Sequence, residues 1–278
     1  MRVTQAREVA PGVVLLTSGA GAFASNMYLV RSGQARVLVD AGWAGTAESV
    51  QRAMERLLGP NEVPGAILLT HLHPDHSGAA GSLARIWQVP VYVHPDELPM
   101  AAGKYRREFS MPLDRWIVVP FLHLLPARTR RRIEAGGDIS DVIRPLPPGR
   151  EVPGLPGWAF VHTPGHTPGH VAFWRSSDRV LITGDAVLTV NLNSLPGLLL
   201  GRPSLAGPPR YTTWNWKKAM DSIEVLANLG PRILAPGHGR PLAIDVVPRL
   251  HALADRRTSQ RKRLSQARGG LRATYLWR

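Results

Sequence analysis

The chain of 278 residues carries a formal net charge of +14, is 44% hydrophobic and contains no cysteine. The absence of cysteine excludes disulfides, thiolate nucleophiles and cysteine-ligated zinc or iron–sulfur clusters, so any transition metal must be held by histidine and carboxylate side chains. No apolar run approaches the roughly 20 residues that a membrane span requires, and the first residues lack the apolar stretch of a signal peptide. We therefore expect a cytoplasmic protein.

The first third of the sequence alternates between short apolar segments and amphipathic ones. Runs of aliphatic and β-branched residues predict strands, while apolar residues three and four positions apart predict helices. Thr46 stands where a helix N-cap is expected, and Gly59 with Pro60 ends that helix. The predicted strands are residues 12–18, 26–32, 35–42, 65–70 and 89–94, and a second helix is predicted for residues 77–88.

Residues 95–145 break this alternation, because they mix proline, arginine and aromatic residues without a regular period. We interpret them as a helical insertion that covers the edge of the main scaffold. Residues 186–209, which are rich in glycine, proline and leucine, are predicted to form a loop. The second half is predicted to contain strands at 158–163, 170–176, 179–185 and 232–239, a helix at 214–229 and a basic helical tail at 243–278.

Both halves place strands first and helices after them, which favours an α/β fold in which two sheets pack face to face with helices outside. We therefore expect a four-layer αββα sandwich, formed by a single domain that spans residues 1–278. Periodicity alone leaves a doubly wound sheet as an alternative, because both arrangements alternate strands with helices.

The segment "THLHPDHSG" concentrates metal-capable side chains directly after a buried strand. In extended backbone, positions i and i+2 lie on one face, so the imidazoles of His71 and His73 can converge on one ion. Asp75 and His76 follow where Pro74 turns the chain, and they can face a second ion beside the first. Zinc takes about four ligands, so further donors must come from distant parts of the sequence.

Three later side chains occupy similar positions at the ends of apolar strands. His166 lies in "TPGHT", Asp185 ends "VLITGD", and His238 lies in "APGHG". In a sandwich such strand ends can meet at one edge, which makes these three residues the candidates for completing the site. His94 and His251 stand outside such motifs, and we interpret them as packed or surface histidines.

Taken together, "HLHPDHSG", "TPGHTPGH", "GDA" and "PGHG" resemble the motifs of the metallo-β-lactamase-fold hydrolases, over most of the chain. The detail "HTPGHTPGH" is most similar to glyoxalase II-type thioesterases and acyl-homoserine lactonases. The resemblance implies the αββα fold and a site with two metals. It further implies that one metal binds His71, His73 and His166, that the other binds Asp75, His76 and His238, and that Asp185 bridges both.

Such a binuclear site implies a hydrolase whose nucleophile is a hydroxide shared by two cations, because the two charges lower the pKa of their common water toward ~7. Asp75 is then a candidate catalytic residue that shuttles a proton, and Asp40 and His170 are candidates for orienting ligand histidines by hydrogen bonds. Zn²⁺ is the expected ion, and Fe²⁺ or Mn²⁺ suits the same His/Asp ligands. The expected substrate is a small molecule with a thioester, ester or lactone bond, and the residues that bind it are unknown.

The insertion at 95–145 combines apolar and aromatic residues with lysine and arginine. We expect it to act as a lid that holds an acyl or otherwise hydrophobic substrate, with one anionic group paired to a cation. A small core of the lid itself, or a dimer contact, would use the same residues.

Two other functions fit parts of the pattern. A phosphodiesterase or nuclease of the same fold would use two metals and the positive charge, provided that the arginines line the metal cleft. A dioxygenase of the same fold would hold a single iron, and the presence of Asp75, His76 and His238 argues against it. The sequence leaves open whether the basic tail binds a polyanion such as nucleic acid or is only a solvated face.

Overall fold

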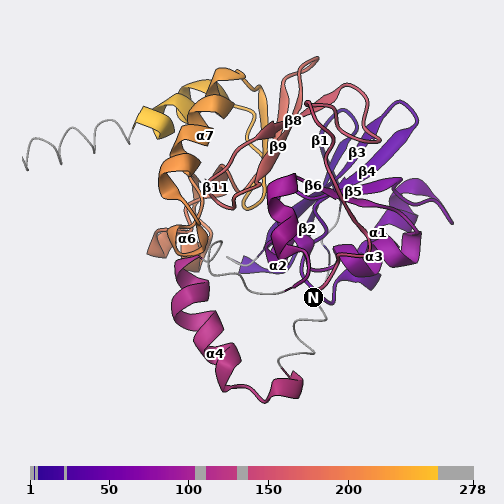
Figure 1. Cartoon of the computed structure of the whole chain (residues 1–278). Helices are drawn as coiled ribbons and strands as arrows, with labels where there is room; N and C mark the ends of the chain where they lie inside the picture. Colours follow the sequence, from indigo (N-terminus) through magenta and orange to yellow (C-terminus); the bar gives the residue numbers. More distant parts are fainter. Residues whose placement is uncertain (1–2, 4–5, 22–23, 104–110, 130–136, 256–278) are drawn as a thin grey trace, which may run out of the picture.

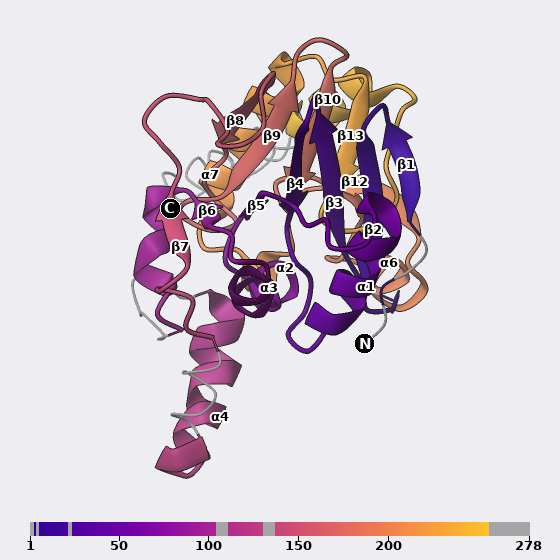
Figure 2. The ribbon, with the colours of Figure 1, turned by 90° about the vertical axis from the view of Figure 1, so that its right-hand side faces the viewer.

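Two β-sheets packed face to face, with helices on both outer sides, form the body of the protein (Figures 1 and 2). The computed structural model describes residue 3 and residues 6–21, 24–103, 111–129 and 137–255. In this part of the chain the first sheet has seven strands and the second has four. The arrangement confirms the predicted four-layer αββα sandwich and rules out a single doubly wound sheet.

The first sheet contains the strands of the N-terminal half in sequence order, from β1 to β7. Strands β1 to β4 are antiparallel, and β4 to β7 are parallel. Because parallel strands end at the same edge, the segments that follow β4, β5 and β6 emerge together. The bounds are β1 Arg7–Ala10, β2 Val13–Ser18, β3 Ser25–Ser32, β4 Ala35–Val39, β5 Ala66–Leu68, β6 Val91–Val93 and β7 Ile143–Pro145.

The second sheet has the strand order β13-β10-β9-β8. Strand β10 pairs antiparallel with β9 and parallel with β13, and Gly184 at its end lies opposite Pro236. The "GD" and "PGHG" motifs therefore leave the second sheet side by side. The bounds are β8 Trp158–His162, β9 Val171–Arg175, β10 Val180–Gly184 and β13 Ile233–Pro236, and a separate hairpin consists of β11 Leu188–Val190 and β12 Pro203–Ala206.

Three apolar clusters fill the spaces between the four layers. Along β3, Leu29 packs with residues of α1 and α3, whereas Tyr28 and Val30 pack with the second sheet, as the alternation of a strand requires. Helix α7 covers the other side of the second sheet, where Ile223 belongs to one cluster with Leu181 of β10. Hydrophobic burial between neighbouring layers therefore holds the sandwich together.

Helices α1, α3 and α7 provide the outer layers, and the short α2 lies near the sheet edge. Thr46 precedes α1 as predicted, but its hydroxyl donates to the carbonyl of Trp43 at 2.7 Å and does not cap the helix. The helix predicted for residues 77–88 is observed as α3, but it begins at Ala80, because Ser77 still belongs to α2 and Gly78 lies between the two helices. The bounds are α1 Ala47–Leu58, α2 Pro74–Ser77, α3 Ala80–Trp87 and α7 Trp216–Asn228.

The stretch 186–209 is more regular than the predicted loop. It contains β11, the short helix α6 (Leu195–Leu200) and β12. Ser194 caps α6 by accepting a hydrogen bond from the backbone N–H of Gly197 at 3.2 Å. Proline near the start and glycine at the end of this segment favoured a loop, but both residues are also typical of helix termini.

The stretch 95–145, predicted as an insertion, leaves the first sheet after β6 and rejoins it at β7. Strand β7 pairs parallel with β6, so its three residues belong to the sheet. The role of the other residues as a lid stays a prediction, and residues 104–110 and 130–136 lie outside the described part. The elements here are the 3-10 helix η2 Pro95–Met100, the π-helical turn η4 Asp114–Val118 and α4 Val119–Leu124.

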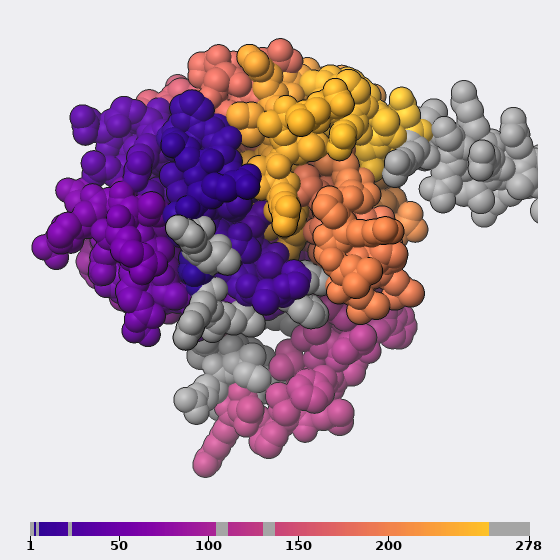
Figure 3. All heavy atoms as spheres, turned by 180° about the vertical axis from the view of Figure 1, so that it is seen from behind, coloured from indigo at the N-terminus to yellow at the C-terminus, as the bar shows by residue number. Residues whose placement is uncertain are grey.

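Helix α4 points away from the body of the protein (Figure 1). Seen from behind, the segment 111–129 that contains it lies against the segment around 190–210 (Figure 3). Both segments expose large apolar side chains, among them Trp116, which is 76% exposed, and Leu199, which is 74% exposed. The two segments 111–129 and 190–210, in which the sequence shows no regular helix or strand periodicity, thus meet on one face of the protein.

The predicted basic tail is described only as far as residue 255. Residues 246–255 are helical, and Leu250 and Leu253 pack in the same cluster as α7. Residues 256–278, which carry most of the predicted tail, lie outside the described residues. In the part of the chain that is described, no helix has both the length and the apolar character needed to cross a bilayer.

Candidate metal centre

The segment after β5 carries four of the predicted ligands. The chain stays extended at His73, with φ −69° and ψ 147°, and Pro74 then begins the short helix α2. Proline favours the first turn of a helix because its φ is already fixed near −65°. This turn separates His71 and His73 from Asp75 and His76, so the two pairs can face different ions.

His71, His73 and His166 form the first group of donors. Their ring centroids lie 4.6, 4.8 and 4.4 Å apart. One ring nitrogen of each lies within 4.8 Å of the others. Three imidazoles that converge in this way are a common ligand set for zinc and other first-row metals.

Asp75, His76 and His238 form the second group. Oδ2 of Asp75 lies 3.2 Å from Nε2 of His238 and 3.6 Å from Nε2 of His76. The Nε2 atoms of the two histidines are 3.3 Å apart. Ligand atoms held at about 2.1 Å around a tetrahedral ion are about 3.4 Å from one another, so these separations suit one ion.

Asp185 lies between the two groups. Its Oδ2 is 3.4 Å from Nε2 of His166 in the first group and 3.3 Å from Nε2 of His238 in the second. Its Oδ1 is 3.3 Å from Nε2 of His76. The structure thus brings together all seven side chains that the sequence suggested as ligands, and Asp185 contacts histidines of both groups.

Three buried atoms that could bind a metal have no hydrogen-bond partner among the residues that the structure describes. They are Nε2 of His71, Nε2 of His166 and Oδ1 of Asp185. A buried polar atom without a partner costs about 1–3 kcal/mol, and a bound cation would remove that cost by accepting the lone pairs. The donor set therefore fits a divalent metal.

The pKa values of the second group show that it attracts positive charge. Burial lowers the pKa of His238, but Asp185 and Asp75 outweigh burial and raise this pKa to about 10. Burial likewise lowers the pKa of His76, and the carboxylates of Asp75, Asp185 and Asp40 raise it well above its usual value. A metal ion among these carboxylates would replace the protons, because imidazole binds a metal only when neutral.

The histidines of the first group are held neutral. Burial lowers the pKa of His71 well below its usual value, and the neighbouring imidazoles of His76 and His73 lower it further. Burial and the neighbouring His73 have the same effect on the pKa of His166. A neutral imidazole offers its lone pair directly, so this group can bind a metal without first losing a proton.

Asp40 lies behind His76. Its Oδ2 is 2.9 Å from Nδ1 of His76, which leaves Nε2 directed at the other donors. Asp40 also accepts a hydrogen bond from the backbone N–H of Thr70 at 2.8 Å. Its φ of 59° lies in the left-handed region that few residues other than glycine adopt. The contact with His76 is consistent with the expected orienting role of Asp40, which stays a prediction.

His170 is expected from the sequence to orient a ligand histidine, but its hydrogen bonds reach Asp185 instead. Its Nε2 accepts from the backbone N–H of Asp185 at 3.0 Å, and its Nδ1 lies 2.7 Å from the hydroxyl of Thr163. Burial lowers the pKa of His170 to about 3, so the ring is neutral and Nε2 can act as an acceptor. His170 therefore holds the backbone of Asp185, whose carboxylate lies between the two donor groups.

Two threonines that the sequence analysis did not identify hold ligand histidines. The hydroxyl of Thr70 lies 3.0 Å from Nδ1 of His71, and the hydroxyl of Thr213 lies 3.3 Å from Nδ1 of His166. Both contacts leave Nε2 of the histidine free for the cluster. Thr70 directly precedes the motif that begins at His71, so the sequence could have suggested its contact with that histidine. No sequence motif surrounds Thr213, so its contact with His166 could not be predicted.

Glycine is required at two places in the ligand loops. A Cβ atom on Gly237 would lie 2.1 Å from Oδ1 of Asp185, so "PGHG" cannot carry a side chain before its histidine. Gly165 has a φ of +141°, and its Cβ would lie 2.0 Å from the backbone nitrogen of Ala219. These close approaches explain why a glycine precedes both distal histidines.

Glu97 of η2 connects the two loops that carry the first donor group. One carboxylate oxygen accepts from the backbone N–H of Leu72 at 2.9 Å, and the other accepts from that of Gly169 at 2.8 Å. Leu72 lies between two ligand histidines, and Gly169 follows His166 in the second loop. Glu97 is fully buried, with 0% exposure. No sequence motif indicated this role.

A cavity of about 1280 Å³ lies beside the cluster. One part of its wall begins at Pro112, next to Met111, whose sulfur is 2.9 Å from Nε2 of His73. Another part contains Tyr211, whose pKa is raised by burial and then by the charge of Asp185. Most of the other lining is apolar, and it includes Leu192, Leu195, Leu198, Leu205, Trp216 and Met220.

The four-layer fold, with seven histidine and aspartate donors gathered where the strands of both sheets end, defines a class of metal-binding hydrolases. Residues 20–238 match the family model of the metallo-beta-lactamase superfamily. The chain belongs to this superfamily.

Individual relatives agree with this membership. Over 206 residues, 38% of positions are identical to the probable metallo-hydrolase YflN of Bacillus subtilis (strain 168), a match that covers 74% of this chain and 76% of YflN. The metallo-beta-lactamase family protein TTHA1429 from Thermus thermophilus has a similar structure, with a TM-score of 0.64, 24% identity and coverage of 92% of this chain and 83% of that one. TTHA1623, solved in a di-iron-bound form, is also similar in structure, with a TM-score of 0.53 and 27% identity. The match covers 83% of this chain and 96% of TTHA1623.

Proposed function

We propose that this protein is a hydrolase that uses two divalent metal ions to cleave a thioester, lactone or ester bond of a small molecule. The observation that carries the proposal is the position of Asp185 between two complete donor groups. An enzyme with one ion would need only one of these groups. The two iron ions in the solved form of TTHA1623 support a two-ion site, and Zn²⁺ is the ion that we expect here.

When bound, two such ions supply a nucleophile from water at neutral pH and polarise the bond that is cleaved. Asp75 is our candidate for moving the proton, because its side chain is 17% exposed whereas that of Asp185 is 4% exposed. Burial raises the pKa of Asp75, but His76 and His238 outweigh burial and hold this pKa below its usual value. The carboxylate is therefore ionised at neutral pH, which is the form that a proton acceptor needs, although the lowered pKa makes it a weak base.

The cavity beside the cluster is our candidate for the substrate site. Its leucine-rich walls suit an acyl chain, and the cations of Arg210 and Lys217 on the same lining suit one anionic group. Pro112 and parts of the segment 191–211 line it, and both belong to stretches that have little regular pattern in the sequence. The bond itself would lie at the Tyr211 side, nearest to the metal carboxylates.

The test is a panel of thioester, lactone, β-lactam and phosphodiester substrates, assayed with protein of measured metal content. We expect about two ions per chain and turnover of a thioester, lactone or ester. Activity confined to phosphodiesters, with binding that weakens steeply with salt and needs residues 256–278, would favour the nuclease instead. Full activity with one iron and consumption of O₂ would favour the dioxygenase.

The acyl site is tested by chain length on a constant head group. Longer chains should raise kcat/KM, by about tenfold for each ~1.4 kcal/mol of added transition-state binding. Leu198→Ala should reduce this dependence, because Leu198 lines the cavity. Leu200→Ala is the matched control, since Leu200 is 75% exposed and lies outside the lining. A flat dependence on chain length would remove the acyl site from the proposal.

A further inference from the structure

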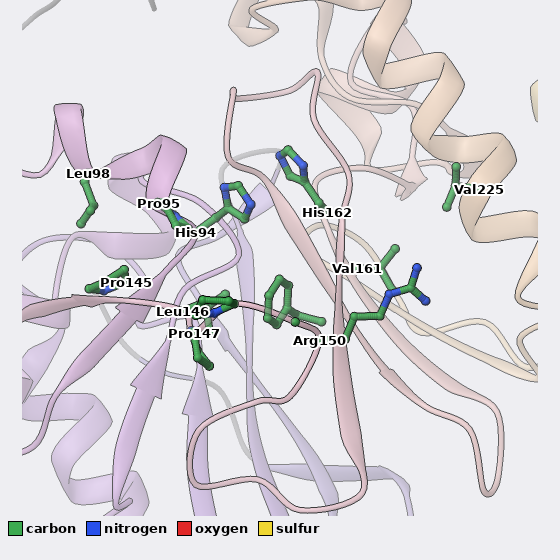
Figure 4. Close-up of a pocket in the computed structure, with 13 residues that line it drawn as sticks. His94, Pro95, Leu98, Pro145, Leu146, Pro147, Arg150, Val161, His162 and Val225 are labelled. Carbon is green, nitrogen blue, oxygen red and sulfur yellow. The ribbon is translucent and has the colours of Figure 1, made fainter.

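A second group of donor side chains lies outside the metal centre. His94 follows β6 of the first sheet, Asp96 lies in η2, and His162 ends β8 of the second sheet. One donor atom from each lies within 4.8 Å of the other two. Figure 4 shows the rings of His94 and His162 side by side above a pocket lined by proline and leucine residues. None of these residues belongs to the site described above.

The distances within this group are close to those around a metal ion. The two rings are stacked, with centroids 4.0 Å apart and planes at 10°. Oδ2 of Asp96 lies 3.7 Å from Nδ1 of His94 and 3.9 Å from Nε2 of His162. Ligand atoms around a tetrahedral ion with bonds of about 2.1 Å are about 3.4 Å apart, so the carboxylate already lies within a few tenths of an ångström of this separation from each ring, and only the orientation of the rings must change.

We propose that His94, Asp96 and His162 form an additional binding site for a first-row divalent transition metal such as Zn²⁺. Two imidazoles and one carboxylate are a donor set that these metals accept. The adjacent cavity of about 720 Å³, lined by both histidines, leaves room for water or another small ligand at the remaining coordination position. With three protein donors on a partly exposed surface, this site binds its ion more weakly than the main centre.

Binding requires two existing contacts to give way. Nδ1 of His94 accepts from the backbone N–H of Asp96 at 3.2 Å, and Nε2 of His162 lies 3.0 Å from the carbonyl oxygen of Pro168. The stacked rings must also open, because parallel rings direct their lone pairs along parallel planes. The χ2 torsions of histidine and aspartate are broad, so these rotations cost little. Burial and then His162 lower the pKa of His94, which keeps this imidazole neutral and able to bind a metal.

An ion at this site would connect η2 to β8. Glu97 follows Asp96 in η2 and accepts hydrogen bonds from the backbone of both loops that carry the first donor group, at Leu72 and at Gly169. The additional ion therefore stabilises the segments behind the main centre without contacting its ligands.

The experiment counts bound zinc in protein without a histidine tag, dialysed against increasing concentrations of free Zn²⁺. At saturation the wild type should hold one equivalent more than His162→Ala. Asp96→Asn keeps the shape of a side chain that is 55% exposed, so it should fold normally and require roughly tenfold or more additional free zinc to fill the site. His251→Ala removes an exposed histidine outside the group, and it should bind as much zinc as the wild type.

A background variant separates this proposal from the proposed function. Asp185→Ala should lose zinc from the main centre, yet adding His162→Ala to it should still remove one further equivalent. That difference does not depend on which reaction the main centre catalyses, or on whether it catalyses one. Equal zinc binding by the wild type, His162→Ala and Asp96→Asn throughout the titration would overturn the additional site.

Discussion

Replacing Glu97 by alanine should destabilise the fold, and the size of the effect should depend on pH. The substitution leaves the backbone N–H groups of Leu72 and Gly169, which Glu97 now satisfies, without their acceptors. Each buried donor without a partner costs about 1–3 kcal/mol, so the loss amounts to about 2–6 kcal/mol in total. The protein also loses a carboxyl group that is fully buried, and this change acts in the opposite direction.

Burial raises the pKa of Glu97 to about 7, whereas an unfolded glutamate titrates near 4.3. The raised pKa contributes stability that is fully present below about pH 4.3 and is lost as the pH rises to about 7. Ionising the buried group therefore costs the wild type about 1 kcal/mol at pH 5 and about 3–4 kcal/mol at pH 8. Alanine avoids this cost, so at pH 5 the lost hydrogen bonds dominate, and at pH 8 the two effects nearly cancel.

The measurement is the free energy of unfolding by denaturant, for metal-free wild type and Glu97→Ala at both pH values. We expect Glu97→Ala to be less stable by about 1–5 kcal/mol at pH 5, and this deficit to shrink by about 2–3 kcal/mol at pH 8. Glu48→Ala is the matched control, because the side chain of Glu48 is 80% exposed and should contribute at most about 0.5 kcal/mol at either pH. A deficit that is absent at pH 5, or that does not change with pH, would refute this account of Glu97.

Three further outcomes test the main centre. Asp185→Ala should bind fewer than two metal ions by elemental analysis and should lose hydrolysis. His251→Ala should keep its metal content and its activity, since the side chain of His251 is exposed. Gly237→Ala should reduce activity by roughly 100-fold or more, because its Cβ would lie 2.1 Å from Oδ1 of Asp185 and displace that carboxylate. The circular dichroism spectrum should stay unchanged. Near-normal turnover would show that the added Cβ does not displace Asp185. Metal affinity should increase from pH 6 to pH 9, because the raised pKa of His238, about 10, makes protons compete with the ion for this imidazole. The increase should be up to about tenfold per pH unit for each proton released. Calorimetry that shows no proton release on metal binding would exclude this competition.

The main strands could be predicted from the sequence because their side chains are buried in a regular pattern. Strand β5 and the residues around it are uniformly apolar, and β2 to β6, β8 to β10 and β13 fall within a few residues of predicted strands. Strands β1, β7 and β12 were missed because they are short and partly exposed, so polar residues and proline interrupt the apolar pattern. Strand β11 is buried, but it has only three residues and was included in the predicted loop 186–209. Helix α6 was missed because its proline and glycine are equally typical of loops.

The seven donors could be singled out because each follows an apolar strand within a compact motif. Their partners could not, since a contact between distant segments leaves no local pattern. Glu97 accepts hydrogen bonds from the backbone N–H groups of Leu72 and Gly169, and every residue but proline has such a group, so the sequence marks neither the carboxylate nor these targets. His94 and His162 are stacked only because the two sheets bring their strand ends together, and His94 by itself suggested a packed or surface histidine.

The donors of the main centre come from both sheets. Four follow β5 in the first sheet, and the others are carried by segments of the second sheet, which is joined to the first by an exposed stretch at residues 147–150. Bound ions would therefore link the two halves of the chain, in addition to the apolar layer that the sheets share. A backbone cut at residue 149 should consequently give two fragments whose reassembly into an active protein depends on metal, and a chelator should favour their dissociation.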